Sequence, residues 1–158
     1  MMHHNAQLLE KLFTSLDKHD HPAMADCYYS GATFKDIAFH LRNKKQIHAM
    51  WHMICEGDIR TSFDIVEVDD RTAKVKVVDD YTFRSSGRKV HNVVESRFWL
   101  RNGSIVAQQD TCDARDWAGM ALGGVNGFLA GRLAFLRRAK ARKTLDAFIG
   151  KHSEYKRN

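Results

Sequence analysis

The sequence predicts an α+β fold in which three helices precede a long antiparallel meander of strands and a further helix ends the chain. In the first 55 residues, apolar side chains recur every three or four positions, which is the period of one helix face. Between residues 62 and 112 they alternate instead, with turn residues between the runs. At 158 residues, with 44% hydrophobic residues, the chain can bury one core. We therefore expect a single domain over residues 1–158.

The predicted helices lie at residues 6–16, from Pro22 onward, and at residues 44–55. Proline suits the first turn of a helix, because the N–H that it lacks would have no partner there. We place Tyr28 at the end of this second, short helix. A short strand at residues 32–37 is expected between the second and third helices.

Four strands are predicted at residues 62–68, 73–83, 90–100 and 105–112. The last two are separated by Asn102-Gly103, the strongest short signal for a hairpin. Short turns between consecutive strands predict an antiparallel meander.

The end of the chain differs in composition from the rest. Residues 117–136 contain five glycines and a single charge, Arg132, and a basic helix is expected to follow and end near Ile149. The glycines argue against a membrane-spanning helix, so we expect a lid over a pocket or a dimer contact. Residues 132–143 hold six Lys or Arg and no acid, the usual composition of a solvated helix face. We therefore predict neither a nucleic-acid partner nor a membrane partner.

The three cysteines are an odd number at wide spacing, which predicts reduced thiols and neither a disulfide framework nor a zinc ribbon; they are Cys27, Cys55 and Cys112. Residues 1–7 lack the basic start and apolar stretch of a secretory signal. Both observations predict a cytoplasmic protein.

Residues 28–36 fit the pattern Y-x-x-x-A-x-F-x-D, which resembles the entry to the first strand of the nuclear transport factor 2-like superfamily. The final strand, residues 102–113, is similar to that superfamily as well. The resemblance covers residues 6–117 and implies a cone-shaped α+β barrel, with a curved antiparallel sheet wrapped by three N-terminal helices. Residues 118–158 would add a glycine-rich segment and a C-terminal helix, as in extended members without an assigned activity.

The superfamily includes ketosteroid isomerases, limonene epoxide hydrolases, polyketide cyclases and scytalone dehydratases. By resemblance, Asp36 occupies the position of the ketosteroid isomerase general base. A carboxyl group in an apolar cone has a raised pKa, which suits proton transfer. The alternative is a strand-end aspartate that caps a turn.

Asp79 shares a strand face with Val75 and Val77, and a buried carboxylate there needs a partner or a proton. By resemblance, Asp79 and Asp110 fall on the two aspartates of the limonene epoxide hydrolase triad. The arginine of that triad corresponds to Val77, so the triad is incomplete unless Arg97 replaces it from a neighbouring strand.

Ketosteroid isomerases also use a tyrosine and a protonated aspartic acid to hold the developing enolate. Glu95 lies close to the position of that acid, whereas the tyrosine corresponds to Leu12. Tyr28 or Tyr81 could replace it. The alternative is that Glu95 and Arg97 pair on the outer face of the sheet.

The candidate catalytic residues are accordingly the acids Asp36, Asp79, Glu95 and Asp110. The expected wall of the pocket contains aromatic, apolar and cationic side chains: Tyr28, Phe34, Met50, Tyr81, Arg97, Phe98 and Trp117. No cofactor is required. His48 and His52 have the spacing of two metal ligands on a helix, but His40 is the only other candidate nearby, and we predict no metal site.

Two functions fit these residues. The first is a binding protein or cofactor-independent enzyme for a hydrophobic small molecule such as a steroid, polyketide or terpenoid, with Asp36 and Asp110 handling protons. The second is an interaction module with a vestigial pocket, in which the outer face of the sheet forms a homodimer or holds a protein partner. We expect a homodimer in either case.

Overall fold

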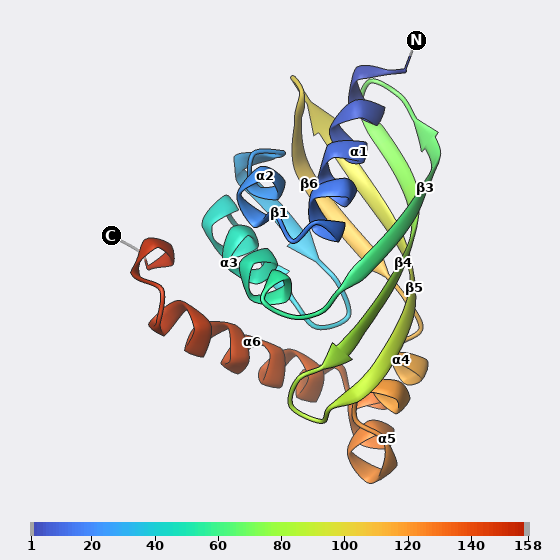
Figure 1. Cartoon of the computed structure of the whole chain (residues 1–158), viewed down its shortest axis with the longest axis vertical. Helices are drawn as coiled ribbons and strands as arrows, with labels where there is room; N and C mark the ends of the chain where they lie inside the picture. The colour runs from blue at the N-terminus through green and yellow to red at the C-terminus, as the bar shows by residue number, and fades with distance from the viewer. Residues whose placement is uncertain (1, 157–158) are drawn as a thin grey trace.

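The computed structural model describes residues 2–156, and Figure 1 shows the path of the chain. Within these residues there are six α-helices: α1 (His4–Asp17), α2 (His21–Ala25), α3 (Lys44–Cys55), α4 (Ala114–Ala121), α5 (Gly124–Arg132) and α6 (Ala134–Gly150). A short 3₁₀ helix, η1 (Ser153–Tyr155), follows. The strands are β1 (Tyr28–Lys35), β2 (His40–Leu41), β3 (Arg60–Val68), β4 (Thr72–Phe83), β5 (Arg88–Arg101) and β6 (Ser104–Thr111).

The six strands form one curved sheet in the order β2-β1-β6-β5-β4-β3. The predicted meander is confirmed, since β3, β4, β5 and β6 pair with one another in antiparallel fashion. The pairing of β1 with β6 is parallel, however, so the sheet is mixed. Because β2 and β3 remain at opposite edges, the sheet curves without closing into a barrel.

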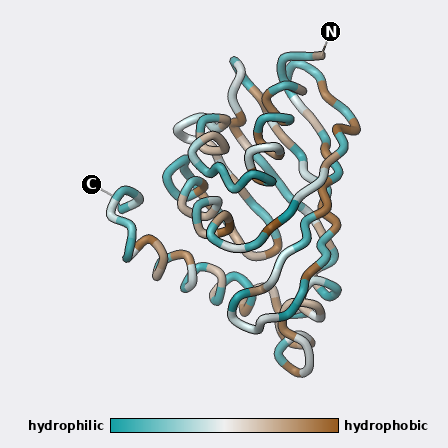
Figure 2. Tube along the Cα trace, viewed as in Figure 1, coloured by the Kyte–Doolittle hydropathy of each residue, from teal (hydrophilic) through white to brown (hydrophobic). Residues whose placement is uncertain are grey.

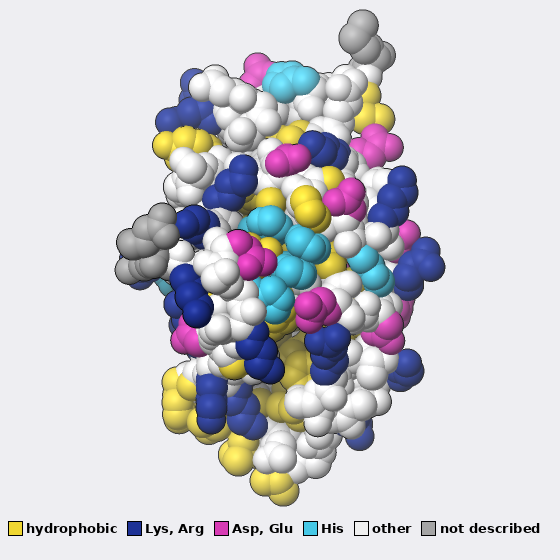
Figure 3. Space-filling view, turned by 60° about the vertical axis from the view of Figure 1, so that its left-hand side comes forward, with side chains coloured by type: hydrophobic (Ala, Val, Ile, Leu, Met, Phe, Trp, Pro, Cys, Tyr) yellow, Lys and Arg dark blue, Asp and Glu magenta, His cyan; other side chains and the backbone are white. Residues whose placement is uncertain are grey.

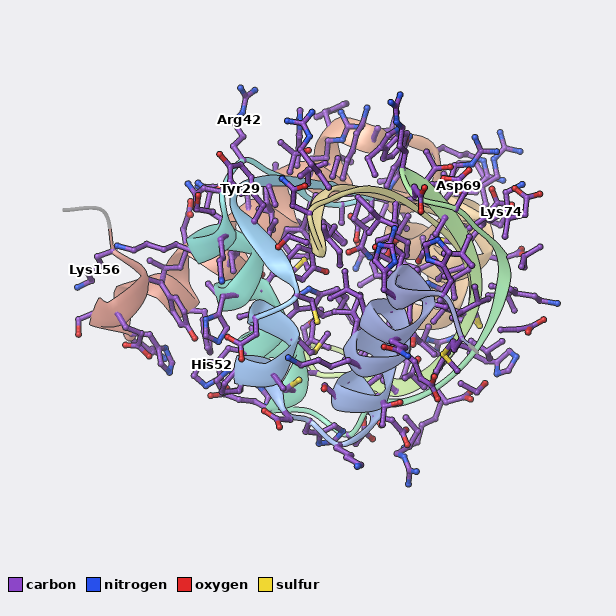
Figure 4. The ribbon with its side chains drawn as sticks, turned by 90° about the horizontal axis from the view of Figure 1, so that it is seen from above. Tyr29, Arg42, His52, Asp69, Lys74 and Lys156 are labelled. Atoms are coloured by element: carbon purple, nitrogen blue, oxygen red, sulfur yellow. The ribbon has the colours of Figure 1, made fainter. Side chains whose placement is uncertain are left out.

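The concave side of the sheet is covered by α1, α2 and α3 (Figures 1 and 4). Every third or fourth residue of α1 is buried, including Leu9, Leu12 and Leu16. The Phe13 ring stacks on Phe63 of β3, with centroids 5.4 Å apart, and meets Phe98 of β5 edge-on at 6.0 Å. Hydrophobic stretches recur along the strands and in the helices that face them (Figure 2). These contacts fix the first helix against the centre of the sheet.

The start of β1 differs from the prediction. Pro22 lies in the first turn of α2, as expected, and the Asp20 carboxylate caps this helix by accepting a hydrogen bond from the Ala23 N–H (3.1 Å). The helix ends at Ala25, however, and Tyr28 begins β1. The Ile105 N–H donates to the Cys27 carbonyl (2.8 Å), so the pairing with β6 draws this segment into the sheet.

The β5–β6 hairpin turns at Asn102 and Gly103, whose φ angles of +50° and +76° both lie in the left-handed region. Two residues of this kind form the turn that matches the twist of a hairpin. The predicted turn is therefore confirmed. All three cysteines are free thiols, also as predicted.

The glycine-rich segment folds into two short helices, α4 and α5, which lie at one end of the sheet (Figure 1). The Asp113 carboxylate caps α4 by accepting from the Arg115 and Asp116 N–H groups. At the other end of α4, Arg88 of β5 donates to the Met120 carbonyl (2.8 Å). No helix within residues 2–156 combines the length and the hydropathy needed to cross a bilayer.

The packing of α5 on α4 requires a glycine at position 127. A Cβ on Gly127 would lie 2.8 Å from the Ala118 carbonyl oxygen, whereas a Cβ on Gly119 would meet nothing within 4 Å. We predict that Gly127→Ala destabilises the protein by about 1–3 kcal/mol, because α5 must move away from α4. Gly119→Ala should be neutral or stabilising by about 0.5–1 kcal/mol, since alanine favours the helix. Urea unfolding of both variants checks this, and equal stabilities would contradict the close approach.

Candidate functional site

The strand registers place a set of polar side chains on the concave face of the sheet. Ser96 of β5 stands opposite Val75 on one side and Asp110 on the other. Four residues beyond Val75 in β4, Asp79 stands opposite Thr61 of β3 and Asn92 of β5. Successive residues of a strand point to opposite faces, so these side chains share the face that α1 and α3 cover.

Asp110 is positioned by a chain of hydrogen bonds through the core. The Trp51 Nε1–H of α3 donates to the Tyr28 hydroxyl oxygen (3.0 Å), and the Tyr28 hydroxyl donates to Gln108 Oε1 (2.5 Å). The Gln108 amide then donates from Nε2 to Asp110 Oδ1 (3.0 Å). Trp51, Tyr28 and Gln108 are all buried. Because every donor in this relay has its acceptor, the orientation of the Gln108 amide and of Asp110 is fixed.

The pKa of Asp110 is raised from its ordinary value to about 7. Burial is the largest cause, since a low-dielectric environment disfavours the charged carboxylate. The nearby acids Asp36 and Asp79 raise the pKa further, while Ser96 and Gln108 act in the opposite direction. Asp110 can therefore take or give a proton near neutral pH.

Ser96 has the one buried side-chain hydroxyl among the described residues that makes no hydrogen bond. The residue is 1% exposed and faces Asp110 across the β5–β6 pair. Its hydroxyl is close enough to favour the charged form of Asp110, but without the geometry of a hydrogen bond. Its hydrogen-bonding capacity is therefore free for another group.

Asp36 follows the last residue of β1 and is both a turn cap and a buried acid. Its Oδ1 accepts hydrogen bonds from the Ala38 N–H (2.7 Å) and the Phe39 N–H (2.6 Å). Burial nevertheless raises the pKa of Asp36, against the two backbone donors and the positive charge of Arg137. Asp36 therefore caps the turn, and it also has the raised pKa expected of a carboxyl group in apolar surroundings.

Asp79 accepts a hydrogen bond from the Thr61 hydroxyl, and burial raises its pKa to about 6. Tyr81, two residues further along β4, accepts a hydrogen bond from the Trp117 Nε1–H of α4 (2.7 Å). Burial raises the pKa of Tyr81 to about 12, and both Asp79 and Asp36 contribute. Trp117 also meets Phe83 edge-on at 5.6 Å. Tyr81 and Trp117 therefore close the end of the concave face that lies beneath α4.

Other predicted wall residues belong to the packed core. Phe34, Met50 and Phe98 are each 1% exposed, and Phe34 meets the Trp51 ring edge-on at 5.8 Å. Tyr28 is buried as well, in the relay described above. These side chains therefore pack in the core beside the site and are not exposed to a ligand.

Glu95 and Arg97 do not reach the site. Both are exposed on the convex face of the sheet, where Arg97 Nε donates to Glu95 Oε1 (3.1 Å). They flank Ser96 in sequence, so strand alternation turns them to the opposite face from Asp110. Leu12, at the expected position of the oxyanion-binding tyrosine, is fully buried in the core. Neither the epoxide hydrolase triad nor the ketosteroid isomerase oxyanion hole is therefore assembled from the residues expected.

Several residues of the site were missed in the sequence: Thr61, Asn92, Ser96, Gln108 and, as a relay member, Trp51. Ser96 and Gln108 carry a signal, because each interrupts an alternating apolar face with a polar side chain. The contact between Trp51 and Tyr28 joins a helix to a strand, and nothing in the local pattern indicates it.

Two hollows lie on the surface. One, of about 320 Å³, is lined by Tyr81 and Met120, by Asp58 from the loop before β3, and by residues of the β4–β5 end: Asp80, Lys89, Val90 and His91. The other, of about 500 Å³, lies beside α3 and η1. Neither is lined by Asp36, Asp79 or Asp110. The first reaches the site only through Tyr81.

The raised pKa of Asp110 makes a prediction about stability. Between about pH 4 and pH 7 the folded protein keeps a proton on Asp110 that the unfolded chain has lost, so stability falls as the pH rises. Asp110→Asn should remove this loss and stabilise the protein at pH 8 but not at pH 4. The gain is at most a few kcal/mol, since one pKa unit corresponds to about 1.4 kcal/mol. Urea unfolding at both pH values measures it.

The control for this experiment is Asp64→Asn, since Asp64 is exposed on β3 and makes no hydrogen bond through its side chain to a described residue. Its effect on unfolding should be the same at both pH values. If Asp110→Asn behaved like this control, Asp110 would be an ordinary solvated carboxylate.

Known proteins share the fold of this chain. The model of the SnoaL-like domain matches residues 9–108 of the chain. A protein of unknown function from Burkholderia pseudomallei, described as NTF2-like, superposes with a TM-score of 0.68 at 14% identity, covering 77% of this chain and 99% of that one. A putative polyketide cyclase from Silicibacter superposes with a TM-score of 0.64 at 14% identity, covering 73% and 93%.

An LEH-like epoxide hydrolase of M. tuberculosis superposes with a TM-score of 0.58 at 16% identity, covering 82% of this chain and 92% of that one. No curated protein matches the sequence significantly. At these identities the solved structures establish the shared fold, which agrees with the resemblance to the nuclear transport factor 2-like superfamily. The family match covers most of the chain, and the protein is therefore a member of the SnoaL-like domain family.

Proposed function

We propose that this protein binds a hydrophobic small molecule and acts on it without a cofactor, with Asp110 as the group that transfers a proton. The observation that carries the proposal is the buried relay from Trp51 through Tyr28 and Gln108, which ends on the Asp110 carboxyl group. A core that only needed to be stable would be better served by apolar side chains at these positions. The names of the structural relatives, a putative polyketide cyclase and an epoxide hydrolase, support small-molecule chemistry.

The arrangement suits removal of a proton from a carbon next to a carbonyl group. The Asp110 carboxylate would take the proton, and the electrons of the C–H bond would move toward the carbonyl oxygen. The free Ser96 hydroxyl, which faces Asp110, could donate a hydrogen bond to that oxygen as negative charge develops. Return of the proton from Asp110 to another position of the substrate completes an isomerisation or prepares a cyclisation.

Epoxide opening is a weaker alternative for this chain. The hydrolase triad that the sequence resembles needs an arginine between its two aspartates. Val77 occupies that position and is buried, and Arg97 lies on the convex face. Within residues 2–156, Asp79 and Asp110 accept hydrogen bonds from the neutral side chains of Thr61 and Gln108, and neither pairs with a Lys or Arg.

We propose that the ligand enters past Tyr81 and Trp117. These residues close one end of the concave face, and Tyr81 also lines the hollow of about 320 Å³ beside α4. Separation of α4 from the sheet would break the hydrogen bond between Trp117 and Tyr81 and those from Ser86 and Arg88 to carbonyls of α4, and would open a path toward Asp79 and Asp110.

A panel of steroids, polyketide-like aromatics and terpenoids tests the proposal. Ligands that raise the melting temperature should then be assayed for conversion by mass spectrometry. Asp110→Asn should retain binding and lower the turnover rate by about 100-fold or more, because general acid–base catalysis typically contributes 10²–10⁴-fold. Asp36→Asn and Gln108→Leu should have smaller effects.

Glu95→Gln is the matched control, since Glu95 directly precedes Ser96 in β5 but lies on the opposite face of the sheet. It should leave binding and turnover unchanged. If no member of the panel stabilised the protein, or if Asp110→Asn and Glu95→Gln were equally active, the proposed chemistry would be wrong.

A second function, dimerisation through the outer face of the sheet, is favoured by its exposed apolar side chains. Val66, Val93 and Trp99 are 53%, 49% and 40% exposed. If this face forms a homodimer, light scattering should give twice the mass of the chain, and Trp99→Glu should give monomers. Val125→Glu, on the exposed apolar side of α5, is the control and should leave the dimer intact; a monomeric Val125→Glu variant would move the interface to α5.

A further inference from the structure

Histidine side chains from three separate segments gather on one face of the molecule, between α3 and the end of the chain (Figure 3). His52 lies on the flank of α3 that faces the C-terminal segment (Figure 4), and His152 lies just beyond α6. Glu56, which ends α3 one turn after His52, lies between them: its Oε1 is 3.7 Å from His52 Nε2 and 3.9 Å from His152 Nε2. Two imidazoles and one carboxylate thus converge from segments about 100 residues apart.

The hydrogen bonds of these rings orient one nitrogen of each toward Glu56. His152 Nδ1 lies 2.8 Å from the Phe148 carbonyl, which can only accept, so Nδ1 carries a proton and Nε2 is the nitrogen that can offer a lone pair. His52 Nδ1 lies 2.8 Å from the Tyr155 hydroxyl, which can donate or accept; when Nδ1 donates to this hydroxyl, the lone pair of Nε2 is directed at Glu56. The orienting of one ring nitrogen by a hydrogen bond while the other faces outward is typical of metal-binding histidines.

The geometry points to a divalent transition-metal site formed by His52 Nε2, Glu56 Oε1 and His152 Nε2, with zinc as the best-fitting ion, and we propose it as such. The three ligand atoms lie within 4.8 Å of one another. Tetrahedral zinc with bonds of about 2.0–2.1 Å places its ligands about 3.3 Å apart, so each histidine nitrogen needs to approach the Glu56 oxygen by only about half an ångström. Three protein ligands leave the fourth position open to water.

The surroundings allow such an ion. The side chains of His52, Glu56 and His152 are 19%, 39% and 25% exposed, so the site is supported by packing but reachable from solvent. Among residues 2–156, Arg84 is the one Lys or Arg that pairs with Glu56, and it does so through the other carboxylate oxygen, Oε2, at 3.6 Å. The Oε1 atom of Glu56 therefore remains available as a metal ligand beside the two histidines. The bound ion would fasten the segment after α6 to α3.

Two neighbouring histidines do not join this set. His21 stacks on His52 with ring centroids 3.8 Å apart, and its Nδ1 lies 2.8 Å from His48 Nε2. His48 and His21 thus satisfy each other, and the pair His48 and His52, which has metal-ligand spacing in the sequence, does not share one site. Their rings pack beside the proposed site and limit the movement of His52.

A second group of possible ligands, His3, His4 and Asp70, lies at the start of the chain. His3 already uses both ring nitrogens: Nδ1 accepts from the Asn5 N–H (3.1 Å) and Nε2 pairs with Asp70 Oδ1 (3.0 Å). It has no lone pair to offer without losing one of these bonds. In the experiment below, this group is therefore the competing zinc site that a substitution of His4 excludes.

The test is calorimetric titration of the full-length protein with Zn²⁺, with Mg²⁺ as the control for a cation that prefers oxygen ligands. We expect one Zn²⁺ per chain and a rise in melting temperature with Zn²⁺ but not with Mg²⁺. His152→Gln and Glu56→Gln should each weaken binding by at least about tenfold and abolish the rise. His91→Gln, an exposed histidine of β5, and His4→Gln should bind as the parent does.

Limited proteolysis gives a second readout that does not depend on activity. Zn²⁺ should slow cleavage after α6 in the parent protein and not in His152→Gln. Absence of Zn²⁺ binding in the parent would overturn the site. So would binding that survives in His152→Gln, or binding that is lost in His4→Gln.

Discussion

The concave face of the sheet contains a carboxyl group, Asp110, that is partly shielded from water and forms no ion pair with a Lys or Arg among residues 2–156. Such a group is costly to bury, and the cost is reduced here by a raised pKa and by the Gln108 amide. Gln108 can serve only because Tyr28 and Trp51 hold its amide in one orientation. The packing of α3 on β1, and of β1 on β6, thus affects whether Asp110 is protonated.

Residues 114–156, the C-terminal extension, contact both ends of this site. Trp117 of α4 donates to the Tyr81 hydroxyl at one end. At the other, Arg137 of α6 donates to the Ile37 carbonyl (3.0 Å), within the turn whose backbone N–H groups bind Asp36. Residues 114–156 therefore continue the wall of the domain, although the family model ends at residue 108. Movement of α4 or α6 would change the surroundings of Tyr81 and Asp36 directly.

The protein shares its scaffold with relatives of different chemistry but not their complete sets of reactive groups. Val77 and Leu12, which by resemblance correspond to an arginine and a tyrosine of the enzymes, are both buried as core residues. Ser96 and Gln108 supply polar groups from other strand positions instead. A scaffold of this kind fixes where a ligand can lie, while the side chains on the inner face decide what happens to it.

Apart from the two-residue β2 and the helices α4 and α5, the sequence by itself determined the order of the elements, because apolar periodicity, Pro22 and Asn102-Gly103 act locally on the backbone. It also determined that Asp79 shares a strand face with Val75 and Val77, since side chains alternate along any strand. The roles assigned to Glu95 and Arg97 could not be settled in this way, because a shift of one residue in register reverses the face.

Only the tertiary structure decided which distant residues meet. The relay joins Trp51 of a helix to Asp110 of the last strand, and the histidine cluster joins His52 to His152. The parallel pairing of β1 with β6 brought Tyr28 into the sheet against the local helical pattern. Contacts of this kind depend on how whole elements pack, and packing is a property of the assembled chain that no local window of sequence contains.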